Sequence, residues 1–217
     1  MLKSRSKTGQ ENSTQSLKTT KYRKSLPYLT IGETVIFPNT IAPIFISGKT
    51  DIKAFETAMD NDKSIIVGYP IDKKKSKAIN NTYKTATLCH ILQVLKLPDG
   101  TVRILVEGVS KVKLTKINYN DFFRCDCKVT PPKEEISSNL LSLLEVVKKV
   151  FSEYSRMHGK IPEEVLTTIE RSDSGNKLLG NICFITPLPY NIKMKYFLED
   201  NNYINLENIA VTLKSEI

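Results

Sequence analysis

The sequence predicts an α+β protein with a β-rich half followed by a helical half. From Ser25 onward, short apolar runs are broken by glycine, proline and asparagine, a pattern typical of short strands joined by turns. Two longer strand-like runs meet at a turn within residues 88–109. After Pro131-Pro132, apolar residues recur every three or four positions, which is the spacing of amphipathic helices. We therefore expect a β-rich subdomain over residues 25–131 and a helical subdomain over 132–217.

The N-terminal segment differs from both halves in composition. Residues 1–25 hold seven basic residues against one acidic residue, a net of +6 out of the chain's +9, which leaves +3 for the rest. Because this segment is polar and has few apolar residues, burial cannot offset the entropy of ordering it. We expect a disordered basic tail over residues 1–24. A solvated leader is the favoured interpretation, and weak, nonspecific contact with nucleic acid is the alternative.

Seven strands and one short helix are expected in the β-rich subdomain. The apolar runs place the strands at residues 26–30, 41–46, 64–69, 84–97, 101–107, 109–117 and 122–129. The helix should run from about Asp51 to Asp60, with Thr50 or Asp51 as its N-cap. Gly108, between two of the strands, predicts a bulge or bend.

The hairpin within residues 88–109 has a turn with a clear chemical basis. Pro98 presets φ, Asp99 can hydrogen-bond to the nearby backbone, and Gly100 accepts a positive φ. The second strand alternates, so one face should be core and the other largely exposed to water. Leu105 is the apolar exception on the exposed face. Such a face could pack on another element or receive a partner.

The helical subdomain should begin with one long amphipathic helix. Its apolar positions have helical spacing and are Ile136, Leu140, Leu143, Leu144, Val147, Val150, Phe151 and Tyr154. Shorter helices are expected over residues 162–170, 174–184, 187–199 and 206–217. The last one reaches the terminus without a stop signal, which indicates a chain cut from something longer.

Composition excludes several classes of protein. No run approaches the roughly 18 apolar residues that a membrane-spanning helix needs, and the N-terminus lacks the apolar middle region of a secretory signal. The four cysteines are irregularly spaced, which fits reduced thiols better than a disulfide framework. The cytoplasm is therefore the expected location.

The residues that suggest chemistry lack the partners that the chemistry needs. Ser47-Gly48-Lys49-Thr50 ends like a phosphate-binding loop, but Pro43 stands where that pattern requires a glycine. Cys89 and His90 are adjacent in a strand, so their side chains should point to opposite faces. The Cys125-x-Cys127 pair lacks a second pair at zinc-finger spacing. We expect no catalytic site, no metal and no cofactor in this chain.

Taken together, several segments resemble the N-terminal domain of the Lon proteases, a family of ATP-dependent bacterial proteases. The resemblance covers most of residues 25–217 and rests on Leu26-Pro27, Val35-Ile36-Phe37-Pro38, Pro43, Glu56-Thr57-Ala58-Met59, Leu95-Lys96-Leu97-Pro98-Asp99-Gly100-Thr101-Val102, Val106-Glu107-Gly108, Lys160-Ile161-Pro162-Glu163-Glu164-Val165-Leu166 and Thr186-Pro187-Leu188-Pro189.

The resemblance implies a PUA-like β pseudo-barrel followed by a helical bundle. It also implies that ATPase and protease modules, with their ATP and Mg²⁺, lie outside this chain. The expected task of the chain is to recognise unfolded or degron-bearing proteins and to help order a homohexamer, with no membrane involved. Two alternatives remain open, a PUA-like RNA-binding module and a standalone adaptor. Steep weakening of binding by salt would favour the RNA-binding alternative.

Recognition of many different sequences favours a shallow apolar surface over hydrogen-bond readout. The candidate substrate-binding residues lie in the proline-bounded loop and strand after residue 35 and on the hairpin, and they are Ile36, Phe37, Pro38, Ile41, Leu97 and Leu105. The competing interpretation is that all six are core, since a register slip of one residue would exchange the two faces of the hairpin. If Phe37 and Leu105 are on the surface, polar replacements should weaken client binding without much loss of thermal stability.

Overall fold

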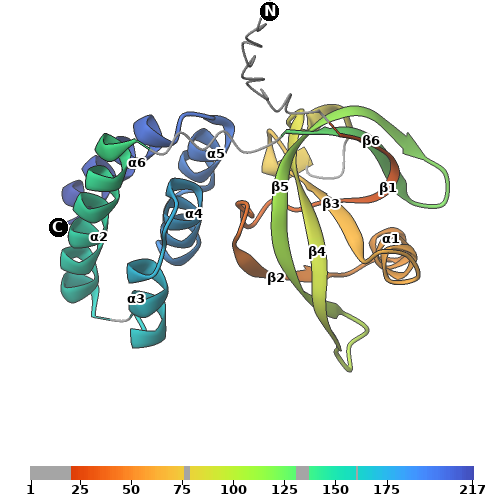
Figure 1. Ribbon diagram of the computed structural model, residues 1–217. Coiled ribbons are helices and arrows are strands. Elements are labelled where there is room, and N and C mark those ends of the chain that lie inside the picture. The colour runs from red at the N-terminus through yellow and green to blue at the C-terminus, as the bar shows by residue number, and fades with distance from the viewer. Residues whose placement is uncertain (1–20, 76–78, 131–136, 160) are drawn as a thin grey trace, which may run out of the picture.

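The computed structural model describes residues 21–75, 79–130, 137–159 and 161–217 (Figure 1). Within these residues the chain forms six strands and six helices, with a β-rich half first and a helical half second. The strands and the first helix are β1 (Tyr22–Thr30), β2 (Ile41–Ile46), α1 (Lys49–Met59), β3 (Ser64–Gly68), β4 (Thr85–Lys96), β5 (Val102–Tyr119) and β6 (Phe123–Val129). The remaining helices are α2 (Ser138–His158), α3 (Glu163–Glu170), α4 (Gly175–Ile185), α5 (Tyr190–Leu198) and α6 (Asn202–Ser215).

The last residues of the predicted basic tail belong to a strand. Strand β1 begins at Tyr22, which pairs with Lys128 of β6, so Arg23 and Lys24 belong to the sheet. Arg23 also forms an ion pair with Asp62. Residues 1–20 of the predicted tail lie outside the described residues, as do residues 131–136 with the start predicted for the long helix.

Two helices, α1 and α6, begin earlier than predicted. The N-cap of α1 is Gly48, with φ of 100°, rather than Thr50 or Asp51. The first backbone N–H groups of α6 are satisfied by the Asn201 side chain, which accepts hydrogen bonds from Tyr203 and Ile204. Because asparagine is a strong N-cap, α6 starts at Asn202, before the first of its predicted apolar positions.

The predicted strands 101–107 and 109–117 form one strand of 18 residues, β5. The bulge or bend predicted at Gly108 is confirmed as a β-bulge, seen as a register shift between the pairs Leu88↔Ser110 and Cys89↔Gly108. A Cβ atom on residue 108 would lie 2.2 Å from the Phe37 carbonyl oxygen, so only glycine allows this approach. The bulge bends the strand while its pairing with β4 continues on both sides.

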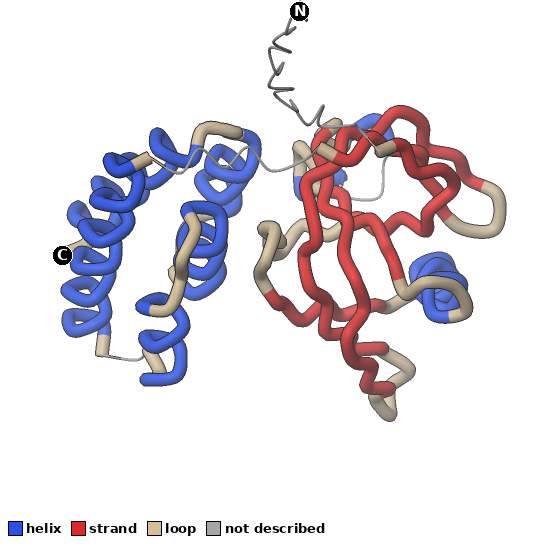
Figure 2. The backbone as a smooth tube through the Cα atoms, in the orientation of Figure 1, coloured by secondary structure: helices blue, strands red, loops and turns tan. Residues whose placement is uncertain are grey.

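The strand pairings form a closed circuit with one strand attached outside it (Figure 2). The order is β2-β5-β4-β3-β1-β6, and β6 pairs with β5 as well as with β1. All pairings are antiparallel except β1 with β3. The five strands of the circuit share a small apolar cluster of Tyr28, Ile66, Ala86, Leu88, Val112, Cys125 and Cys127. Among the strands of the described residues, β2 pairs with β5 alone and is the edge of the sheet.

One large core joins the two halves of the molecule. The Phe197 ring of α5 makes edge-on contacts with Phe37 and Tyr69, at centroid distances of 5.6 and 5.0 Å. Nearby, the Lys111 ammonium of β5 donates to the Glu199 carbonyl oxygen (2.9 Å) and pairs with the Asp200 carboxylate. Burial lowers the pKa of Lys111, although the charges of Asp200 and Glu199 oppose this shift.

Among the described residues, no helix is long and apolar enough to cross a bilayer.

Candidate functional site

The β4–β5 hairpin has the turn that its sequence predicts. Leu97 and Thr101 close the ladder through a backbone hydrogen bond of 2.8 Å, and the Asp99 carboxylate accepts from the Thr101 N–H at 2.9 Å. Gly100 has φ of 83°, a value that glycine adopts without strain. The turn therefore fixes the register in which the two long strands present their side chains.

The core face of this hairpin is confirmed. Val102, Ile104 and Val106 are each at most 5% exposed, and Cys89 is fully buried on the same side of the sheet. The odd-numbered residues between them face the other way. Leu105 is half-buried on that outer face and does not belong to the core.

The outer face of β2, β5 and β4 carries an apolar surface, which we call the client face because it contains three of the residues predicted to contact clients. The register aligns Pro43 with Leu105 and Leu105 with Gln93, and it aligns Phe45 with Arg103 and Arg103 with Leu95. A bulge in β4 leaves Leu92 as an extra residue beside this row. The apolar members of the client face are Ile41, Pro43, Phe45, Leu92, Leu95, Leu97 and Leu105.

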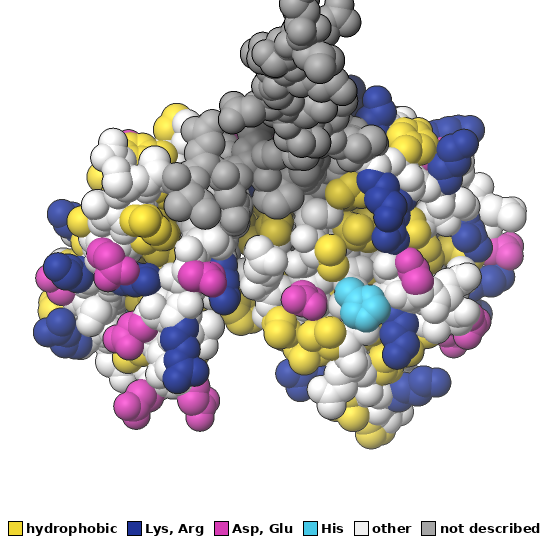
Figure 3. All heavy atoms as spheres, viewed as in Figure 1, with side chains coloured by type: hydrophobic (Ala, Val, Ile, Leu, Met, Phe, Trp, Pro, Cys, Tyr) yellow, Lys and Arg dark blue, Asp and Glu magenta, His cyan; other side chains and the backbone are white. Residues whose placement is uncertain are grey.

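The client face is unusually exposed for apolar strand residues. Ile41, Phe45 and Leu95 are 50%, 58% and 51% exposed, and Leu92 is 44% exposed. Figure 3 shows hydrophobic side chains gathered over β2 and the neighbouring β4–β5 hairpin, with charged side chains around them. A contiguous apolar patch with a polar rim is typical of a surface that binds another molecule.

One cation and one anion belong to the client face. The Arg103 guanidinium lies 5.9 Å from the centre of the Phe45 ring, so it partly covers the ring while its charge stays in water. Glu107 is half-buried and pairs across the sheet with Ile41 on one side and His90 on the other. The face is therefore apolar along its length and has opposite charges at its two ends.

The structure contradicts the predicted surface position of three site residues. Ile36, Phe37 and Pro38 are buried, so none of them presents a surface to a client. The backbone of Ile36 is held by the Tyr69 hydroxyl, which accepts from the Ile36 N–H at 3.0 Å and donates to its carbonyl at 3.1 Å. Proline and turn residues around this segment suggested an exposed loop, but these hydrogen bonds draw it into the core.

The other three predicted residues lie on the client face. Ile41 is exposed, and Leu97 and Leu105 are half-buried. Sequence reasoning missed Phe45 and Leu95, which are more exposed than Leu105. The signal for Phe45 was available, because alternation along the predicted strand 41–46 places it on the same face as Ile41.

The residues with potential chemistry remain separate from one another. Cys89 is buried and His90 lies on the opposite face, so they do not form a nucleophile and base pair. Burial raises the pKa of the Cys89 thiol far above its ordinary value. Lys49, the lysine of the P-loop-like motif, is exposed at the start of α1. Within the described residues, no three His, Cys, Asp or Glu side chains gather as metal ligands.

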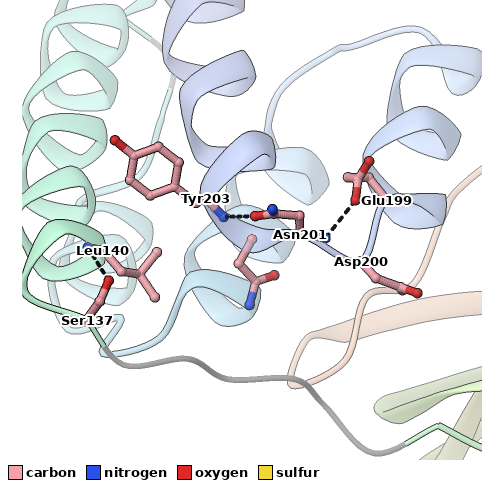
Figure 4. Close-up of a pocket in the computed structure, with 7 residues that line it drawn as sticks. Ser137, Leu140, Glu199, Asp200, Asn201 and Tyr203 are labelled. Carbon is pink, nitrogen blue, oxygen red and sulfur yellow. Dashed lines mark hydrogen bonds between the residues drawn. The ribbon is translucent and has the colours of Figure 1, made fainter.

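A pocket of about 380 Å³ lies between the start of α2 and the α5–α6 turn (Figure 4). Two of its polar side chains, Ser137 and Asn201, are helix N-caps. Ser137 accepts from the Leu140 N–H, and Asn201 accepts from the Tyr203 N–H. The Glu199 carboxylate accepts from the Asn201 N–H at 2.7 Å. Because these groups hold the ends of helices, the pocket is less suited to a ligand than the client face is to a partner.

Comparisons with known proteins agree on one family. A family model described as the ATP-dependent protease La (LON) substrate-binding domain matches residues 25–210. Lon protease 1 of Hydrogenovibrio crunogenus is 30% identical over 200 residues, which are 90% of this chain and 24% of that relative. The Lon protease of Escherichia coli K12 is 29% identical over 199 residues, which are 90% of this chain and 25% of that protein. The chain thus spans about a quarter of the length of these relatives.

Solved structures show the same fold. The N-terminal domain of a Mycobacterium avium complex Lon protease has a TM-score of 0.72 and 16% identity, covering 88% of this chain and 98% of that one. A Lon N-terminal domain protein from Xanthomonas campestris has a TM-score of 0.59 and 14% identity, covering 86% and 97%. At such low identity, the similarity concerns the arrangement of the elements and not individual site residues.

Proposed function

Because this chain belongs to the family of ATP-dependent protease La (LON) substrate-binding domains, we propose that its client face binds unfolded or degron-bearing proteins for a protease. The observation that supports this function is the exposure of Ile41, Phe45 and Leu95 on one continuous sheet face. Apolar contact is largely independent of sequence, as recognition of diverse unfolded chains requires. The rigid sheet below holds these side chains in place before a client arrives.

We extend the proposal to the protein that contains this domain. Its ATPase and protease modules, with ATP and Mg²⁺, belong to sequence outside this chain, and this domain itself is not catalytic. The domain helps to order a homohexamer. The closed circuit of five strands, with β2 attached, supports a PUA-like pseudo-barrel. The four cysteines are free and buried, which is consistent with the reducing cytoplasm.

A matched pair of leucine substitutions tests the client face. Leu95 on the face and Leu141 on α2 are 51% and 50% exposed. We expect Leu95→Ser to weaken binding of an unfolded protein, for example reduced and carboxymethylated α-lactalbumin, about three- to tenfold. This range corresponds to the loss of roughly 1 kcal/mol of apolar contact. Leu141→Ser should leave the affinity unchanged, and fluorescence anisotropy measures both.

Equal effects of Leu95→Ser and Leu141→Ser on affinity would contradict the assignment of the face. Repeating the titration at several salt concentrations separates the proposal from the RNA-binding alternative. Apolar binding should depend weakly on salt, whereas binding through several phosphates falls steeply as salt rises.

A further inference from the structure

Strand β2 has an open edge whose backbone groups can be assigned from the register. The Gly108 N–H donates to the Thr40 carbonyl oxygen at 2.9 Å, so residue 40 directs its carbonyl toward β5. In an antiparallel ladder such groups alternate, and Ala42 and Ile44 therefore bond to β5. Ile41 and Phe45, together with Pro43 between them, direct their backbone groups to the open edge. A proline at position 43 agrees with this assignment, because it has no N–H to give to the ladder.

This edge has no partner within the described part of the chain. No hydrogen bond joins the outward N–H and C=O groups of Ile41 and Phe45, or the Pro43 carbonyl, to any described residue. Along this short strand, two donors and three acceptors are therefore unpaired among the described residues. The side chains of the same residues belong to the client face, so the edge and that face are continuous.

Pro43 also distinguishes between possible occupants of the edge. If two copies of β2 paired with each other, each would bring the same missing donor, and the joint ladder would lack two hydrogen bonds. A segment of an unfolded protein brings its own full set of donors and acceptors and loses only one. Proline at an edge is a known protection against self-association of sheets. The edge is thus better suited to a foreign extended chain than to a second copy.

We propose that an extended segment of an unfolded client adds to the edge of β2 as a further strand of the sheet. This inference rests on the proposed function and specifies how the client is held. The backbone ladder gives affinity that is independent of sequence. Client side chains on the outer face lie beside Ile41, Pro43 and Phe45, which favours segments with apolar or β-branched residues at alternate positions.

Amide hydrogen exchange, followed residue by residue by NMR, tests the proposal directly. The probe is reduced and carboxymethylated α-lactalbumin at saturating concentration, with the whole 217-residue chain. We expect exchange at Ile41 and Phe45 to slow about tenfold or more when the client binds. Ala42 and Ile44 are internal controls, because their amides are already bonded to β5 with or without the client.

Three outcomes of this experiment have different meanings. Client binding with unchanged exchange at Ile41 and Phe45 overturns strand addition and leaves the proposed function standing. Absence of any client binding overturns both. Slowing of exchange that appears without client and grows with protein concentration shows pairing of two copies, which also overturns the proposal.

A pair of variants provides a second test, which separates the contribution of the backbone hydrogen bond to client binding from that of the side chain. Phe45→Pro and Phe45→Val both remove the ring, but only Phe45→Pro removes the outward N–H. Neither disturbs the ladder with β5, since this N–H points away from it. We expect Phe45→Pro to bind the client about five-fold more weakly than Phe45→Val, as the loss of one hydrogen bond predicts. Equal affinities of the two variants would overturn the proposal.

Discussion

Asp62 ties the start of β1 to the turn between α1 and β3. One of its carboxylate oxygens accepts from the Ser64 N–H at 3.1 Å, and the other pairs with Arg23 at 3.1 Å. Burial alone would raise the pKa of this carboxyl. The Ser64 N–H and the Arg23 guanidinium outweigh that effect and hold the pKa below its ordinary value of 3.8.

We expect Asp62→Asn to lower the free energy of unfolding by less than about 1 kcal/mol at pH 7, because the Asp62 side chain is 57% exposed and solvent screens the pair. A carboxyl whose pKa is lower in the folded state than in the unfolded state stabilises the fold at pH values above its unfolded pKa of about 3.9. This contribution is lost as the pH falls through the pKa of the folded state. The difference between wild type and variant should therefore shrink in acid. Urea denaturation from pH 7 to pH 2.5 measures it, with the exposed Asp60→Asn as control. A difference that stays constant with pH would contradict the role of the charge.

Residue burial was the least predictable property of the candidate site. Alternation correctly placed Leu105 on the outer face of its strand, since a strand has a period of two. Phe37 lies in a loop, where no period applies. Its burial depends on Phe197, which is 160 positions later in the chain and contacts it only in the folded state. Local sequence cannot encode such a contact.

Gly108 determines the path of β5 through its bulge. The Phe37 carbonyl passes so close to residue 108 that any side chain must displace backbone. We expect Gly108→Ala to destabilise the fold by about 1–3 kcal/mol, as overpacking of a core does. Chemical denaturation measures the loss. Val109→Ala, at the exposed bulge residue beside it, is the control and should have a smaller effect.

The sequence predicted closely where the helices and strands lie, but it did not predict the residues at which they begin and end. The hairpin turn at Pro98-Asp99-Gly100 was correct because its geometry depends on local residues. The bulge at Gly108 was predicted, but the continuity of the two apolar runs beside it as one strand, β5, was not. Asn201 was likewise available as a cap before α6, but the apolar period there begins five residues later, at Leu206.

The junction between the halves determines how the whole molecule unfolds. Phe197 from the helical half packs against two rings of the β-rich half, and Lys111 from the β-rich half bonds to the turn that follows α5. A shared core of this kind predicts one cooperative transition for both halves. The relevant contacts lie between residues far apart in sequence.

We expect Phe197→Ala to lower the free energy of unfolding by about 3–5 kcal/mol, the usual cost of removing a buried ring. It should also separate the unfolding of the two halves. Helical circular dichroism and hydrogen exchange of the strands follow each half during urea denaturation. Leu198→Ala, at the partly exposed neighbour, should leave a single transition. A single transition in Phe197→Ala as well would show that other contacts couple the halves.

Whole-molecule topology was predictable only in outline. The order of a β-rich half and a helical half follows from the change of period at the two prolines. The pairing of β6 with both β1 and β5 does not, because several strands of similar length and composition could pair in other orders. The resemblance to the Lon family supplied the expected architecture, and the family match over residues 25–210 confirms that relationship.

Strand β5 pairs with β2 over residues 102–107, with β4 over residues 102–113 and with β6 over residues 112–119. A shift of β5 by one residue at the client face would also break its register with β6, so the face cannot rearrange without opening the circuit of strands. On the proposed function, almost all the entropy lost in binding is then lost by the client. Mutations that loosen β6, far from the client face, would make this domain lose conformational entropy on binding as well. This added entropic cost would reduce the domain's selectivity for chains that are already unfolded.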